Sequence, residues 1–232
     1  MILRVDYLTK QYKHQDGLVN ALDHVSFEVK KGSFVTITGP SGSGKSTLLL
    51  ALFGLIKPTS GTIYFNGKKI SDASDAELAS IRQEHIGFIM QNFALIPYLS
   101  TIQNIMIPLA LQNVGQKEQM ERATEVLSFV GLGNRKNHLP RELSTGQQQR
   151  IAIARALVHN PSVILADEPT GNLDPALSLE ILDFLKKINV TKDITVIMVT
   201  HSPVAAGYGN IKIHLQEGQL IKSKTKESIL VV

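Results

Sequence analysis

The stretch Gly39-Pro40-Ser41-Gly42-Ser43-Gly44-Lys45-Ser46-Thr47 decides how this chain folds. It matches the pattern G-x-x-x-x-G-K-[ST], in which glycines let backbone N–H groups turn toward a phosphate chain at the start of a helix. Residues 34–38 before it are β-branched or aromatic, and residues 48–53 after it are apolar. This order predicts a buried strand, a phosphate-binding loop and a buried helix.

The same motif places two reactive side chains. Lys45 supplies a mobile positive charge for the outer phosphates, and the hydroxyl of Ser46 is placed to bind Mg²⁺. We therefore expect a bound nucleotide. A glycine-rich turn that only joins a strand to a helix is the alternative, and many fold families share this loop. The function must therefore be argued from the rest of the site.

Length and composition set the frame for that search. The chain has 232 residues, of which 43% are hydrophobic and 19% are charged, which suits one α/β domain with or without a subdomain. It has no cysteine, as a reducing cytoplasm permits. The longest apolar run, residues 48–56, is far short of the ~20 residues that span a bilayer. We expect a soluble, unexported protein. Its net charge of +4 is only weak support for a nucleic-acid partner, so no nucleic-acid partner is expected.

Two further apolar runs end in polar residues. Residues 162–166 lead into Asp167 and Glu168, and residues 194–200 lead into His201. In an open parallel sheet, ligands bind beyond the carboxyl ends of the strands, so all three groups should meet the phosphate loop. Asp167 is placed to hold the Mg²⁺ shell and Glu168 to accept a proton from an attacking water. Taken alone, a histidine at this position is more typical of packing than of chemistry.

The rest of the chain divides into a β-rich start and a helical middle. Residues 2–7 and 25–29 alternate in polarity and predict an antiparallel strand pair, with Tyr12 in the connection. A tyrosine there can stack on a nucleotide base or simply pack. Between Gln91 and about residue 160 the pattern turns helical, with predicted helices at 101–112, at 116–130 and from 144 onward.

The segment Leu143-Ser144-Thr145-Gly146-Gln147 narrows the family. Ser144 and Gln147 have the spacing of a helix capping box, which is the simpler interpretation. At this point the sequence resembles the ATP-binding cassette (ABC) ATPases, whose signature reads Leu-Ser-Gly-Gly-Gln. Nearly the whole chain shares the resemblance. The family's motifs occur in order at Tyr12, residues 39–46, Gln91, residues 143–147, the Asp167-Glu168 pair, residues 173–174 and His201.

The predicted fold class is α/β: a P-loop NTPase with a mainly parallel core sheet, an N-terminal antiparallel β subdomain and an inserted α-helical subdomain. Residues 1–232 would form a single nucleotide-binding domain. Within it, residues 1–91 and 161–232 would form the ATP-binding core with its β subdomain. Residues 92–160 would form the helical subdomain that carries the signature.

The resemblance implies a site shared between two copies of the chain. In the family, cassettes pair head to tail, and the signature of one closes over ATP on the phosphate loop of the other. Ser144 and Gly146 would then contact the γ-phosphate of the partner's ATP, and Asp174 would link the two sites. Gln91 would sense Mg²⁺ and the membrane subunit, and His201 would contact the γ-phosphate.

These inferences give a set of predicted site residues. The catalytic residues are Glu168, His201 and Lys45. The nucleotide-binding residues are Tyr12, Gly39, Pro40, Ser41, Gly42, Ser43, Gly44, Lys45, Ser46, Thr47, Gln91, Ser144, Gly146, Gln147 and Asp174. The Mg²⁺ ligands are Ser46, Gln91 and Asp167.

One residue departs from the family pattern. Thr145 replaces the first glycine of the signature and adds a β-branched side chain where backbone should approach phosphate. The site can keep its form if this residue holds a negative φ, as the start of a helix allows. The change therefore puts the affinity or the rate of the shared site in question.

Within the family, residues 93–97 and 168–174 look like the branch that serves lipoprotein release, macrolide and peptide export, and cell division. The resemblance implies a homodimer that hydrolyses ATP with Mg²⁺ on the inner face of the cell membrane and acts on an integral permease subunit.

A soluble cassette acting on DNA or in a cell-division complex is the alternative. DNA-acting relatives carry a long coiled coil between glutamine and signature, and the 53 positions from Gln91 to Ser144 hold no sustained heptad. A translation-type cassette normally has two cassettes in one chain, and a simple P-loop kinase would leave the signature unexplained.

Overall fold

A six-stranded sheet forms the centre of the computed structural model, which describes residues 1–14 and 17–225. The strand order is β10-β9-β3-β8-β7-β6. All neighbouring strands pair in parallel except β9 and β10, which form an antiparallel hairpin at the end of the sheet. The strands are β3 (Phe34–Thr38), β6 (Ile86–Ile89), β7 (Val163–Asp167), β8 (Thr195–Val199), β9 (Ile211–Gln216) and β10 (Gln219–Thr225). The mainly parallel core sheet is confirmed.

The central strands are apolar on both faces because helices cover both sides of the sheet. On β8, Ile197 and Val199 pack with α1 (Lys45–Leu52), whereas Val196 and Met198 pack with α6 (Pro175–Lys192). Strands buried in this way read as continuous apolar runs, which explains why the sequence located them. Their carboxyl ends consequently share one edge of the sheet.

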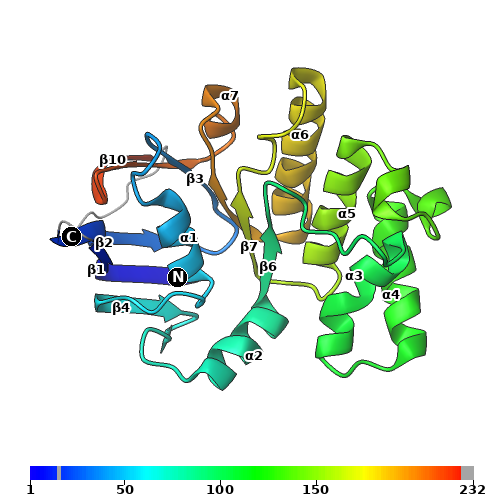
Figure 1. Cartoon of the computed structure of the whole chain (residues 1–232), viewed down its shortest axis with the longest axis horizontal. Coiled ribbons are helices and arrows are strands. Elements are labelled where there is room, and N and C mark those ends of the chain that lie inside the picture. The colour runs from blue at the N-terminus through cyan, green and yellow to red at the C-terminus, as the bar shows by residue number, and fades with distance from the viewer. Residues whose placement is uncertain (15–16, 226–232) are drawn as a thin grey trace.

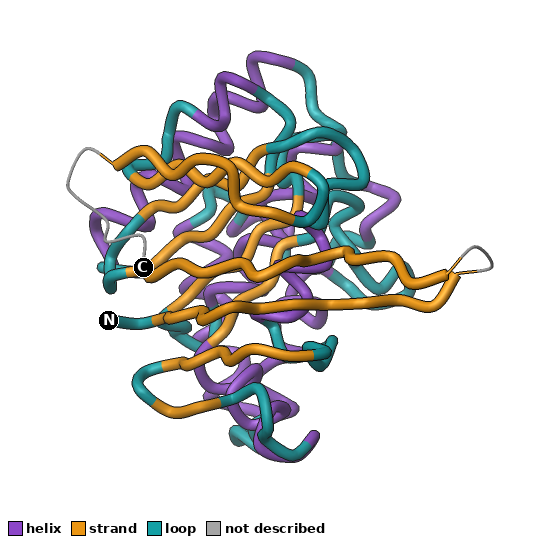
Figure 2. Tube along the Cα trace, turned by 90° about the vertical axis from the view of Figure 1, so that its left-hand side faces the viewer, coloured by secondary structure: helices purple, strands orange, loops and turns teal. Residues whose placement is uncertain are grey.

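A second, antiparallel sheet covers the far side of α1 (Figure 1). Its order is β2-β1-β4-β5, with β1 (Leu3–His14), β2 (Gly17–Val29), β4 (Ser60–Phe65) and β5 (Lys68–Lys69). The β1–β2 hairpin is much longer than predicted and extends beyond the rest of the molecule (Figure 2). The placement of Tyr12 in a connection was therefore wrong, because Tyr12 lies within β1 and pairs with Val19 of β2.

The helical subdomain lies to one side of the core sheet (Figure 1). It contains α3 (Thr101–Leu111), α4 (Gln116–Phe129) and α5 (Thr145–Leu157), with short 3₁₀ turns at Gly133–Arg135 and Pro140–Glu142. The three helices share a core that includes Ile105, Leu127 and Ile151. The predicted starts of all three helices and the predicted ends of the first two are confirmed to within one residue, whereas the subdomain boundaries at residues 92 and 160 stay a prediction.

Two helices outside this subdomain complete the chain. The short α7 (Pro203–Ala206) follows His201. The helix α2 (Asp75–His85), which precedes β6, was not predicted from the sequence. Ser74 caps α2 through a capping box with Glu77, but Leu78 is its one fully buried residue. A helix with so little buried surface lacks the apolar periodicity that marks the others.

Candidate nucleotide-binding site

The phosphate loop runs from β3 into α1 as predicted, and its glycines are required by close contacts. Gly39 has φ 150°, and a Cβ there would lie 2.0 Å from the carbonyl oxygen of Leu215. Gly44 has φ 96°, and a Cβ there would lie 2.1 Å from the carbonyl oxygen of Ala21. Both positions therefore combine a backbone conformation that favours glycine with a neighbour that leaves no room for a side chain.

Lys45 is the first residue of α1 and is buried beneath this loop. Its Nζ donates hydrogen bonds to the carbonyl oxygens of Gly39 at 3.0 Å and Pro40 at 2.7 Å. Burial lowers the pKa of Lys45, and the negative charges of Glu168 and Asp167 partly oppose that shift. The ammonium group is thus held across the loop, where phosphate oxygens can replace the two carbonyls as its partners.

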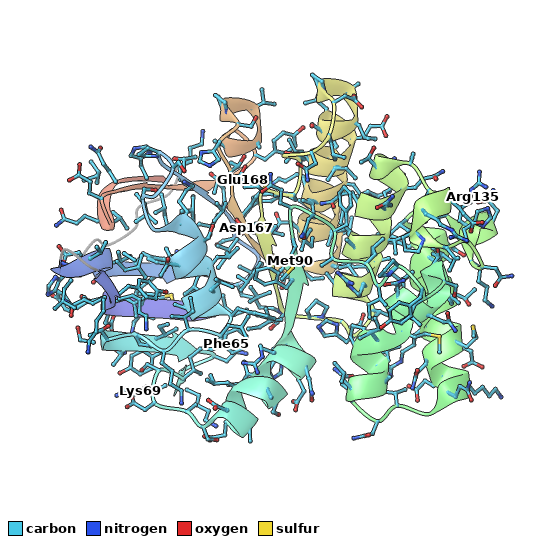
Figure 3. All side chains as sticks on the ribbon, viewed as in Figure 1. Phe65, Lys69, Met90, Arg135, Asp167 and Glu168 are labelled. Atoms are coloured by element: carbon cyan, nitrogen blue, oxygen red, sulfur yellow. The ribbon has the colours of Figure 1, made fainter. Side chains whose placement is uncertain are left out.

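Asp167 ends β7 beside the start of α1 (Figure 3). Burial raises the pKa of its carboxyl group, while a hydrogen bond with the Ser46 side chain and the charge of Lys45 act in the opposite direction. The structure thus brings together two of the three predicted Mg²⁺ ligands, a hydroxyl and a carboxylate. Mg²⁺ prefers such oxygen donors and is usually held by one or two carboxylates together with substrate phosphates, so these residues fit the ion.

Glu168 and His201 meet at the neighbouring strand ends. The Nε2 of His201 lies 2.6 Å from the Oε1 of Glu168. Glu168 has a left-handed backbone with φ 47°, and its N–H donates to the carbonyl oxygen of Val199 at 3.0 Å. A left-handed glutamate is uncommon, and such strain concentrates at functional sites. Glu168 lines the same cavity as the phosphate loop.

A cavity of about 220 Å³ joins these groups. Nine predicted site residues line it, together with Ala21 of β2, which was not predicted from the sequence. The lining consists of Ala21, Ser41, Gly42, Ser43, Gly44, Lys45, Ser46, Thr47, Glu168 and His201. Ala21 was missed because it lies beside the phosphate loop in the folded structure but far from it in the sequence.

Tyr12 and Gln91 do not line this cavity. Tyr12 is 42% exposed on the β1–β2 hairpin. Gln91 follows β6, and its carbonyl oxygen accepts a hydrogen bond from Asn172 Nδ2 at 2.9 Å. Its side chain lies against Gly171, where a Cβ would come within 2.8 Å of Gln91 Nε2. The structure therefore places Gln91 beside the loop that follows Glu168, and its predicted contact with Mg²⁺ stays a prediction.

The signature residues lie apart from the cavity as well. Ser144 caps α5: its Oγ accepts from the Gln147 N–H at 3.4 Å, and Gln147 Oε1 accepts from the Ser144 N–H at 3.1 Å. Gly146 is buried against Leu177 of α6. Asp174 caps α6 by accepting from the Leu177 N–H at 3.0 Å. The capping interpretation is confirmed, while contact of these residues with nucleotide stays a prediction.

Two side chains of α5 were not singled out from the sequence. The buried Gln149 donates through Nε2 to the carbonyl oxygen of Pro169 at 2.6 Å, next to Glu168. Arg155 donates to two carbonyl oxygens in the loop after Gln91. For Gln149, a polar residue at a buried position of α5 was the available signal. Its partners, however, lie too far away in sequence to be inferred from spacing.

By fold and site, the chain is a P-loop nucleotide-binding protein: its phosphate loop and its acidic pair meet at the same edge of one parallel sheet. A family model described as "ABC transporter" matches residues 22–171, which is more than half of the sequence. The chain therefore belongs to the ABC transporter family of ATP-binding proteins, as the resemblance implied.

Individual relatives agree with this placement. An uncharacterized ABC transporter ATP-binding protein of Methanocaldococcus jannaschii, MJ0796, is 44% identical over 94% of this chain and 95% of its own length. A dimeric structure of the MJ0796 cassette, in a post-hydrolysis state bound to ADP and Pi, has a TM-score of 0.90 and covers 98% of this chain and 100% of that one.

A second relative is larger than this chain. The macrolide export ATP-binding/permease protein MacB of Syntrophobacter fumaroxidans is 41% identical over 94% of this chain, but the match spans 31% of MacB. Most of MacB therefore lies outside its match to this chain. Among residues 1–14 and 17–225, no helix of the present structure combines the length and the apolar character needed to cross a bilayer.

Proposed function

We propose that this chain is the ATP-hydrolysing subunit of an ABC transporter, in which two copies close on ATP and thereby move a separate membrane subunit. One observation carries the proposal: the cavity holds the phosphate loop, Glu168 and His201, while Ser144 lies exposed at the start of α5, outside it. The N-terminus of a helix is an anion site, and a second copy can bring the start of α5 to the first copy's phosphates. The dimeric MJ0796 cassette supports this arrangement.

The residues of the cavity suit ATP hydrolysis. Lys45 exchanges its two carbonyl partners for phosphate oxygens, and Ser46 with Asp167 would hold Mg²⁺, which neutralises charge that develops on the phosphates. Glu168 accepts the proton of the attacking water. The 2.6 Å contact with His201 orients the Glu168 carboxylate until nucleotide arrives.

The proposed membrane contact is an apolar groove between the core and the helical subdomain. It has a volume of about 530 Å³, and its lining includes Phe53, Phe88, Ile107 and Leu111. Arg82, Arg155 and His159 also line it, and no carboxylate does. This chemistry fits an apolar segment with an acidic residue. The permease part of MacB supports a membrane subunit as the occupant.

For the cargo, we propose export or extraction of a lipoprotein, a peptide or a drug. The support is the resemblance of residues 93–97 and 168–174 to that branch, together with the macrolide-export name of the MacB relative. A DNA-acting cassette finds no support in the fold, because the described residues between β6 and α5 form helices of only 11 and 14 residues. The proposed location is the inner face of the cell membrane.

Co-purification tests this function. The tagged chain should recover an integral membrane subunit from detergent-solubilised membranes. The variant Leu111→Glu should lose that subunit, because the exposed Leu111 lines the groove. Val190→Glu is the matched control, since Val190 is exposed on α6 and does not line the groove. Recovery of the same subunit by both variants, or recovery of DNA in a salt-dependent manner instead, would contradict the proposal.

A further inference from the structure

The loop that follows Gln91 has an uncommon backbone. Phe93 has φ 60° and Ala94 has φ 46°, so two consecutive residues with side chains adopt the left-handed conformation. That conformation is disfavoured whenever a Cβ is present, and it persists only where neighbouring groups enforce it. Local hydrogen bonds, from the Phe93 N–H to Met90 and from the Ala94 N–H to Asn92, shape the turn but do not attach it to another element.

Arg155 supplies that attachment. Its Nη2 donates to the carbonyl oxygen of Phe93 at 2.8 Å, and its Nη1 donates to the carbonyl oxygen of Ala94 at 2.6 Å. The guanidinium group is a planar fork with donors fixed in one plane, so it can hold two successive carbonyls in a single orientation. The side chain is half-buried and reaches the loop from the helix α5.

The next anchor of the loop belongs to a different helix. Asn104 of α3 is fully buried, accepts from the Ile96 N–H at 2.8 Å and donates to the carbonyl oxygens of Ile96 at 3.1 Å and Leu99 at 3.0 Å. Asn104 thus fixes the far end of the loop, and Arg155 fixes the end beside Gln91. Ala94, Ile96 and Arg155 also line the groove that we assign to the membrane subunit.

Helix α5 therefore connects the partner's nucleotide at one end with the Gln91 loop at the other. At its N-terminus is Ser144, which we place against the partner copy's nucleotide. Near its C-terminus, Arg155 holds the loop that carries Gln91. A 13-residue helix moves as one body, so a shift of Ser144 is passed to whatever Arg155 holds.

We propose that Arg155 is a positioning residue that holds residues 93–94 in their left-handed conformation and so makes Gln91 move together with the signature helix. Arg155 acts through Gln91 and does not itself touch nucleotide. The inference rests on the ATP hydrolysis and on the role of Gln91 proposed above. Its first readout, the exchange of backbone amides, does not depend on either.

The test compares two identical substitutions on the same helix. Arg155→Lys keeps the charge but offers one point donor in place of the fork. Arg150→Lys changes a half-buried arginine that pairs with Glu180 and donates to the carbonyl oxygen of Val130, and so has no contact with residues 93–94. In Arg155→Lys, we expect amide hydrogen exchange in residues 90–96 to rise on the order of tenfold, with α5 still protected. We expect kcat for ATP to fall about tenfold while KM changes less than about threefold. Arg150→Lys should match the wild type in all of these.

A second substitution separates positioning from general damage to the fold. Glycine adopts the left-handed conformation without strain. Ala94→Gly therefore removes part of the need for the two Arg155 hydrogen bonds. We expect the double variant Arg155→Lys/Ala94→Gly to recover kcat to within about threefold of the wild type.

Three results would overturn the proposal. They are unchanged exchange in residues 90–96 of Arg155→Lys, faster exchange without any loss of kcat, and a loss of kcat that Ala94→Gly does not relieve. If the wild-type chain itself hydrolysed no ATP, the proposed function would fail, whereas the exchange of residues 90–96 would still report whether Arg155 holds the loop.

Discussion

Glu168 is the residue on which the proposed chemistry depends most. It sits in a left-handed backbone, lines the phosphate cavity and contacts His201 at 2.6 Å. Glu168→Gln preserves the shape of the side chain but removes its ability to accept a proton. We expect ATP turnover to fall by about 10²-fold or more, the range for loss of a general base, with nucleotide binding retained. Steady-state phosphate release and a binding titration measure the two effects, and unimpaired release would remove Glu168 from this role.

Thr145 tests how much the altered signature matters. It is the first residue of α5, it is exposed, and it is not among the residues with positive φ. The condition set from the sequence is thus met, because a threonine with a helical backbone leaves the N-terminus of α5 intact. We expect Thr145→Gly to leave ATP turnover unchanged or to raise it. A drop of more than tenfold, about 1.4 kcal/mol of barrier, would count against this view.

Asp167 gives the site a predictable pH dependence. Burial raises the pKa of Asp167 above its usual value of 3.8, so the folded protein favours the protonated carboxyl group more than the unfolded chain does. The ionised carboxylate therefore lowers the free energy of unfolding above the folded-state pKa, and this cost disappears below the unfolded value of about 4.

Asp167→Asn removes that ionisation. Without nucleotide, we expect the variant to melt a few degrees above the wild type near about pH 7.5, and the difference to vanish as the pH falls below about 4. Stabilisation of the variant by MgATP should be smaller, because a ligand of the ion is lost. Thermal melts across this pH range make the comparison. A variant that melts below the wild type by the same margin at every pH would contradict the argument.

Among the elements, strand β6 and helix α5 come into unusually close contact. A Cβ on Gly87 of β6 would lie 2.3 Å from the carbonyl oxygen of Ala156 in α5. That atom belongs to the backbone, so Gly87→Ala would push the signature helix away from the sheet. We expect a cost of about 1–3 kcal/mol and a melting temperature lower by about 2–10 °C.

Gly115→Ala is the control for that prediction. Gly115 precedes α4 with an ordinary φ of −61°, and a Cβ there would meet nothing within 4 Å. Gly115 is the N-cap of α4, where alanine is less favourable than glycine, but alanine also loses less conformational entropy on folding. Because the two effects oppose each other, we expect a net change of only a few tenths of a kcal/mol. Equal melting temperatures for the two variants would show that α5 does not depend on this close approach.

Elements were predictable from the sequence where burial dictates the pattern. Strands β7 and β8 are buried on both faces, and α6 has an aspartate cap followed by proline, so local residues specified each of them. The outer half of the β1–β2 hairpin was not predictable, because its residues are mostly exposed and pair through their backbones. The α2 helix was missed for a similar reason, since it buries little.

Residues of the site followed the same division. The phosphate loop and the Asp167-Glu168 pair are contiguous in sequence, so their chemistry could be inferred from spacing. Ala21, Gln149 and Arg155 reach the site through contacts made only after folding. The position of the Gln91 side chain against Gly171 also depends on two loops that are 80 positions apart in the sequence. No local pattern encodes such a contact.

In the whole molecule, each chain supplies half of one shared site from its core and half of another from its helical subdomain. Its core carries the phosphate loop, Glu168 and His201, and its helical subdomain carries Ser144 at an exposed helix start. Since the Ser144 end is not part of the cavity, we expect hydrolysis to need two chains. The rate should therefore depend on the concentration of dimers.

A dilution series is the critical test. Phosphate release per chain is measured at saturating MgATP over a series of protein concentrations, and sedimentation under the same conditions reports the fraction of dimer. We expect activity per chain to fall in step with the dimer fraction and to approach zero for the monomer. Full activity per chain at concentrations where the protein is monomeric would contradict it.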